Sequence, residues 1–333
     1  MMTASVSSYK KSFFDYFPAP RFLKMSTVGL AFSDDAIRII EFKGVNGSLS
    51  LGRFGEMALP IGSIKDGYIA EIPSLSRFLS EIKSRKNLSF VRASLPEEKG
   101  YVFTIRVPDL SYKEIRSSIE YKMEENVPLS LSEIIFDFNI IPDSRDENGT
   151  IEVAVSVLPE KVVTTYVDAL HSADIEPVAF EIESQAIARA VVKKDEKGVY
   201  AIANISKHKV GLYIVNNGVV VFTSTLSMLD REKGQSFEAF MLEEMEKLFI
   251  FWTTRKGDNI KQSEHIAHVK LVGDHPDMER LKVFLSAGLV VPAEIGNVWT
   301  NAFSFERHIP EISKRDSVRF AAAVGLALSS HNL

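Results

Sequence analysis

VYAIANISKHKVGLYIVNNGVVVFTST, residues 199–225, predicts three consecutive β-strands. Its apolar and β-branched runs at 200–205, 210–216 and 219–225 are separated by short polar turns. The second turn, Asn216-Asn217-Gly218, carries residue types that tolerate the positive φ angles of a tight hairpin. We therefore expect an antiparallel meander at the start of the second half of the chain.

The first half of the chain repeats this pattern. Strand-like runs at 28–33, 36–42 and 49–57 predict another meander, and each meander is followed by a segment with helical spacing and then a further strand. Repetition of the same βββαβα plan indicates an internal duplication, which is typical of the actin and hexokinase architecture. The sequence thus predicts an α/β protein with two similar domains, and ligands of such folds bind in the cleft between them.

The domain boundaries follow from this duplication and from one insertion. An extra α+β unit interrupts the first copy, and its first helix has the capping box Ser111-Tyr112-Lys113-Glu114. We expect an N-terminal arm at 1–26, a first actin-like domain at 27–96 completed by a C-terminal helix at 316–330, the inserted unit at 97–172, a connector strand and helix at 173–198, and a second actin-like domain at 199–315.

Composition excludes several classes of protein. The 333 residues are 45% hydrophobic and 25% charged, which is ordinary globular usage. The absence of cysteine excludes disulfides and thiolate metal sites and favours the cytoplasm, and a net charge of −5 argues against nucleic acid as a partner. No run approaches the roughly 18 to 20 apolar residues that span a bilayer, so we expect any membrane association to be peripheral.

The first 26 residues are less ordinary. They combine basic side chains with the aromatic cluster Phe13, Phe14, Tyr16, Phe17 and Phe22, a pattern that suits contact with a membrane or a partner. A tail packed on its own domain explains the same residues, and the sequence leaves both interpretations open.

Several motifs resemble those of the PilM family of type IV pilus assembly proteins and, more distantly, FtsA and the cytoplasmic part of GspL. They are MEENVPL at 123–129, FDF at 136–138, LPEKVV at 158–163 and ESQAIARA at 183–190. The resemblance implies duplicated actin-like (ribonuclease H-like) domains with an inserted FtsA-type α+β subdomain. It also implies a cytoplasmic location at the inner face of the cytoplasmic membrane.

The resemblance further implies a partner. In PilM-like proteins the cytoplasmic N-terminal tail of the membrane protein PilN docks in a groove beside the inserted unit, where an extended peptide adds to a sheet edge. Other platform or motor components and a second copy of the chain are further candidate partners. The residues that we expect at the groove are Phe103, Ile105, Ile119, Met123 and Tyr166, although for any one of them packing in the subdomain core is the simpler explanation.

The nucleotide loops that the resemblance implies are degenerate. Ala31 stands where relatives have aspartate and Ser33 where they have glycine; in the second loop Asn204 and Ser206 make the same two replacements. The third loop keeps only Gly273 of a triple glycine. An actin-type ATPase needs carboxylates for the metal and glycines at the phosphates. We therefore expect no catalytic residue, no metal site and no cofactor, with ATP and Mg²⁺ bound only if the degenerate site retains affinity.

The sequence thus favours a non-catalytic scaffold of a type IV pilus or related assembly platform. Two alternatives stay open. One is a divergent actin-fold ATPase that binds nucleotide through altered contacts. The other is the GspL-like cytoplasmic part of a type II secretion platform.

Overall fold

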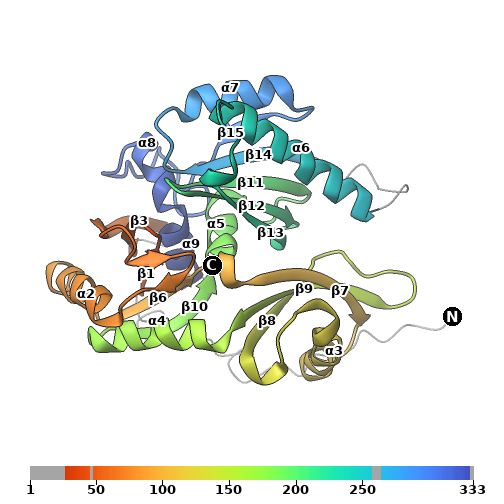
Figure 1. The fold of residues 1–333 in the computed structure, drawn as a ribbon, viewed down its shortest axis with the longest axis horizontal. Helices are drawn as coiled ribbons and strands as arrows, with labels where there is room; N and C mark the ends of the chain where they lie inside the picture. The colour runs from red at the N-terminus through yellow and green to blue at the C-terminus, as the bar shows by residue number, and fades with distance from the viewer. Residues whose placement is uncertain (1–26, 46–47, 257–263, 331–333) are drawn as a thin grey trace.

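The computed structural model describes residues 27–45, 48–256 and 264–330 (Figure 1). The predicted N-terminal arm at 1–26 lies outside the described residues. The described chain forms two lobes and an inserted subdomain, with the second lobe above the first in Figure 1 and the inserted subdomain beside the first. Within these ranges no helix is long and apolar enough to cross a bilayer.

The first lobe contains a five-stranded sheet. Its strands are β1 (Val28–Phe32), β2 (Ala36–Val45), β3 (Ser48–Ala58), β6 (Phe90–Leu95) and β10 (Glu176–Ile182). They lie in the order β10-β6-β1-β2-β3, with β1, β2 and β3 antiparallel and with β6 parallel to both β1 and β10. The predicted meander of the first half is confirmed, and the strand of the 173–198 connector forms the outer strand of this sheet.

The second lobe repeats this sheet. Its strands are β11 (Val199–Ile205), β12 (Lys209–Asn216), β13 (Val219–Ser227), β14 (Ile266–Gly273) and β15 (Ala293–Ile295). Their order from β15 is β15-β14-β11-β12-β13, with the same directions as in the first lobe. The identical strand order confirms the duplicated actin-like plan that the sequence predicts.

Helices cover both faces of each sheet, so the central strands β1 and β11 are buried almost throughout. The outer helices are α2 (Ile72–Lys86) and α4 (Glu160–Ser172) in the first lobe, and α6 (Phe237–Lys256) and α7 (Met278–Gly288) in the second. Between the sheets lie α5 (Glu183–Val191) and α9 (Ala321–Ser329). This central layer shares one hydrophobic core with the inner faces of both sheets.

The two central helices pack unusually closely. A methyl group added at Gly325 of α9 would lie 1.7 Å from the carbonyl oxygen of Ala186 in α5. Only glycine allows this approach, because any side chain would overlap the neighbouring backbone. The final helix is not continuous as predicted: a short helix, α8 (Lys314–Ser317), and a tighter 3₁₀ turn at Val318–Phe320 precede α9.

The inserted subdomain consists of a three-stranded sheet and one helix. Its elements are β7 (Tyr101–Pro108), α3 (Tyr112–Asn126), β8 (Ile134–Ile140) and β9 (Thr150–Pro159), with the strand order β7-β9-β8. The predicted capping box at the start of α3 forms, with the backbone N–H of Ser111 donating to Glu114 at 3.1 Å.

The boundary of the inserted unit differs from the expected residue 172. α4 packs beside α2 on the sheet of the first lobe, because its apolar stripe of Val162, Tyr166, Ala169 and Leu170 belongs to that core. The inserted unit therefore ends with β9.

Candidate functional site

The cleft between the lobes is closed by a buried lysine. Lys209, at the start of β12, reaches from the second lobe to two carboxylates of the first. Its Nζ lies 3.4 Å from Asp34 in the β1–β2 turn and forms a hydrogen bond with Glu98, in the 3₁₀ turn η2 (Glu97–Lys99). The lysine side chain is only 14% exposed, so this ion pair lies largely out of solvent.

A second set of polar groups continues inward from this ion pair. The Tyr213 hydroxyl donates to Glu97 Oε1 at 2.6 Å, and Asn204 Nδ2 lies 3.2 Å from the same hydroxyl oxygen and 3.3 Å from Glu183 Oε1. Gly211 makes room for the group, because a methyl at that position would lie 2.3 Å from Glu97 Oε1. Residues of both lobes thus fill the cleft with a connected polar network.

Burial governs the protonation of this network. Desolvation raises the pKa of Glu183 to about 7, against the lowering effect of the Lys209 charge, and raises the pKa of Glu97 well above its ordinary value. Burial also raises the pKa of Asp34. For Lys209, burial lowers the pKa, but Glu98, Glu183 and Asp34 outweigh it and raise the pKa above the ordinary lysine value. The lysine therefore stays charged while the innermost carboxyls favour the protonated form.

The first degenerate loop is held by its own side chains. Ala31 is buried in the core shared by the two lobes. Ser33 donates to Asp35 Oδ1 at 2.7 Å and accepts from Arg38 Nη1 at 3.0 Å. Its side chain therefore ties the β1–β2 turn together.

The second and third loops come together with the first at the cleft. Ser206 closes the β11–β12 turn through its backbone N–H, which donates to the carbonyl of Lys209 at 2.9 Å. Gly273 has φ of +98°, and a methyl there would lie 2.0 Å from the carbonyl oxygen of Ile205. Gly273 is thus needed for the close approach of β14 to β11, whatever the cleft binds.

A separate groove runs between the inserted subdomain and the first lobe. It encloses about 500 Å³ between β8, β10 and the end of α9. Both β8 and β10 are outer strands of their sheets, and Figure 1 shows them on adjacent parts of the molecule. Apolar side chains supply much of its lining: Leu95, Ile135, Leu158, Val163, Phe180, Ile182 and Leu326.

The residues predicted for partner binding do not line this groove. Ile119 and Met123 have no exposed surface, and Phe103 and Ile105 pack against the same core of the inserted subdomain. Tyr166 lies apart from these four, 1% exposed in the core of the first lobe, where its hydroxyl donates to the carbonyl of Gly67 at 3.1 Å. The five predicted residues therefore belong to the cores of the inserted subdomain and the first lobe, and other residues line the groove.

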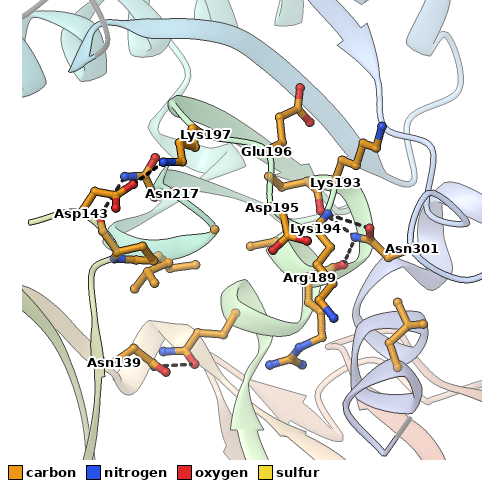
Figure 2. Close-up of a pocket in the computed structure, with 18 of the residues that line it drawn as sticks. Asn139, Asp143, Arg189, Lys193, Lys194, Asp195, Glu196, Lys197, Asn217 and Asn301 are labelled. Atoms are coloured by element: carbon orange, nitrogen blue, oxygen red, sulfur yellow. Dashed lines mark hydrogen bonds and ion pairs between the residues drawn. The ribbon is translucent and has the colours of Figure 1, made fainter. Parts of the chain in front are cut away.

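A larger cavity of about 570 Å³ adjoins the groove, at the loop 192–198 (Figure 2). Lys197 pairs with Asp143 at 2.7 Å, and Asn301 Nδ2 donates to the backbone carbonyls of Arg189 and Val192. Asn139 lines both cavities. Because basic and acidic side chains both line this cavity, it indicates no particular ligand.

Sequence reasoning missed the acidic side of the cleft and the lining of the groove. Glu97, Glu98 and Glu183 come from turns and a helix start that show no local motif. A usable signal was present at Ile135, since the alternation of β8 leaves this isoleucine on the face opposite its buried neighbours, 47% exposed.

Comparison with solved structures found proteins of similar fold. The PilM-PilN type IV pilus biogenesis complex matches with a TM-score of 0.75 and 19% identity, over 93% of this chain and 100% of that chain. The cytoplasmic domain of EpsL, an inner membrane component of the type II secretion system of Vibrio cholerae, matches with a TM-score of 0.49 and 9% identity, over 92% and 95%. The ethanolamine utilization protein EutJ from Carboxydothermus hydrogenoformans matches with a TM-score of 0.48 and 12% identity, over 91% of this chain and 89% of that chain.

No curated protein sequence matches the chain. A family model described as type IV pilus assembly protein PilM matches residues 29–228, more than half of the chain. Together with the duplicated sheets and the inserted subdomain, this match shows that the chain belongs to the PilM family of type IV pilus assembly proteins, with an actin-like fold.

Proposed function

We propose that this protein is a non-catalytic scaffold of the pilus assembly platform, which binds the cytoplasmic N-terminal tail of a PilN-like membrane protein. It then sits in the cytoplasm at the inner face of the cytoplasmic membrane, held there through its partner. The complex of a structurally similar PilM with PilN supports this proposal.

The observation that carries the proposal is the groove between β8 and β10. Each strand has a neighbour on one side only within the described chain, so each presents backbone N–H and C=O groups along a free edge. An extended peptide can pair with such an edge while its apolar side chains enter the lining of the groove. This mode of binding needs no catalytic residue.

The cleft supports the absence of ATP hydrolysis. The Lys209 ammonium group and its carboxylate partners occupy the position where loop residues of both lobes meet. Asn204, which replaces a family carboxylate, is hydrogen-bonded within the protein. Metal-assisted phosphoryl transfer needs free carboxylates for Mg²⁺ and open space for three phosphates. The paired side chains of this cleft therefore favour a protein that does not hydrolyse ATP.

Tail capture can be tested with two matched variants. Ile135→Asp places a charge on the exposed lining of the groove, and Ile140→Asp makes the same change at the end of β8, outside the groove. We expect fluorescence anisotropy with a labelled synthetic PilN-type tail peptide to show at least tenfold weaker binding for Ile135→Asp, since apolar contact is lost. The affinity of Ile140→Asp should equal that of wild type, and an equal loss in both variants would place the tail elsewhere.

A further inference from the structure

We infer that the groove selects a tail that carries a carboxylate side chain, which Arg92 binds. This inference rests on the proposed function and adds the chemistry of the partner. Arg92 lies on β6 at the groove, and the proposal follows from the state of its guanidinium group.

Arg92 is a cation that has no partner in the described part of the chain. Within residues 27–45, 48–256 and 264–330 its guanidinium group makes no hydrogen bond or ion pair, and Nε is buried with no acceptor. Burial of a charged donor without an acceptor is unfavourable, so most such groups are paired in folded proteins. Since Arg92 also lines the groove, we infer that a ligand in the groove supplies the missing acceptor.

The neighbouring strand β10 leaves space beside Arg92, whereas on the β1 side the backbone of α9 packs directly against Gly29. In the sheet register Arg92 lies between Gly29 of β1 and Ala179 of β10, two residues with little or no side chain. The nearest element of the central layer is the end of α9, where Leu326 and Ser329 line the groove. A ligand side chain would therefore approach Arg92 from the β10 side, past the small side chain of Ala179.

The acidic residues of the groove do not satisfy this cation. Glu181 is engaged by Arg189, whose Nη1 lies 2.6 Å from its carboxylate. Asp137 lies on the opposite wall, in β8, and its Oδ1 accepts from the backbone N–H of Phe138 at 2.9 Å. The remaining demand at Arg92 is for a planar acceptor with two oxygens, the geometry that a carboxylate offers to guanidinium.

The apolar lining of the groove also restricts its occupant. Leu95, Phe180 and Ile182 line the groove from the face of the sheet opposite to Arg92, so a fully charged segment would lose solvation along much of its length. The chemistry fits an extended apolar tail with one acidic residue positioned at Arg92. Because the ion pair lies in a partly enclosed groove, solvent weakens it less than a surface pair.

The test uses full-length protein and fluorescein-labelled synthetic peptides covering the cytoplasmic tail of the PilN-like protein. The peptide that binds is also made with each Asp or Glu replaced by its amide and by Lys. We expect Arg92→Met to bind the acidic peptide at least tenfold more weakly than wild type does. The variant should also lose the preference for the acidic peptide over its amide. Arg92→Glu with the Lys peptide should restore binding at least partly, which a merely structural role of Arg92 would not produce.

Arg77→Met, an exposed arginine on α2 outside the groove, is the control and should bind like wild type. If Arg92→Met weakens acidic and amide peptides equally, or not at all, while Ile135→Asp abolishes binding, the carboxylate inference is wrong and tail capture stands. If no tail peptide binds wild type, both proposals fail together.

Discussion

At the scale of single residues, the cleft depends on Lys209. Its ammonium group is the cation that the carboxylates of Asp34 and Glu98 share, and those carboxylates belong to the other lobe. Removing one member of a buried ion pair leaves the others charged and poorly solvated, which costs more than the pair contributes.

We predict that Lys209→Met lowers the free energy of unfolding by about 3 kcal/mol, the usual cost of breaking a buried ion pair. Urea unfolding followed by circular dichroism measures the change. Lys207→Met, two residues earlier and exposed, is the matched control and should unfold like wild type. An unchanged midpoint for Lys209→Met would show that the carboxylates of the cleft do not need the lysine.

Glu183 predicts a dependence of stability on pH. Its pKa is about 7 in the folded protein and near the ordinary 4.5 when unfolded, so the folded state retains the proton between these values. The contribution of Glu183 to the free energy of unfolding is therefore fully present below about pH 4.5 and is lost as the pH rises to about 7.

Glu183→Gln should remove this contribution, because glutamine does not ionise. We expect the variant to gain stability over wild type at pH 7.5 and little or nothing at pH 5, measured as urea midpoints. Glu160→Gln changes the first residue of another helix, α4, where the side chain is exposed, and should show no such difference between the two pH values.

At the scale of elements, the contact between α5 and α9 joins the two lobes. Alanine in the middle of a helix normally stabilises it relative to glycine by up to about 1 kcal/mol. At Gly325 the sign should reverse, because the added methyl would lie 1.7 Å from the Ala186 carbonyl oxygen and force the helices apart.

We therefore predict that Gly325→Ala destabilises the protein by about 1 to 3 kcal/mol, as overpacked cores do. Differential scanning calorimetry measures this as a fall in Tm. Gly44→Ala is the control, since a methyl at Gly44 has no atom within 4 Å. A Tm for Gly325→Ala at or above that of wild type would mean that the helices separate without cost.

The elements themselves could largely be predicted from local patterns. Both meanders and the capping box of α3 follow from apolar alternation and short-range hydrogen bonding, which depend on neighbouring residues only. The assignment of α4 failed because its apolar stripe fits either core, and only the tertiary structure shows that it packs beside α2. The groove between β8 and β10 likewise depends on how two separate sheets are placed.

At the scale of the whole molecule, duplication supplies two lobes and the insertion supplies one wall of the groove that we propose binds the tail. The cleft could be located from sequence because its loops follow equivalent strands in each copy. Its acidic partners could not, because Glu97, Glu98 and Glu183 come from segments far from Lys209 in sequence. The proposed tail site therefore lies at the groove and not at the cleft, which the side chains of both lobes fill.

The most direct test is a calorimetric titration of full-length protein with the synthetic tail peptide, carried out with and without ATP and Mg²⁺. The account predicts the same Kd in both conditions, and no heat of binding when ATP and Mg²⁺ are titrated alone. Micromolar binding of ATP, or tail binding only in its presence, would contradict a scaffold that works without nucleotide.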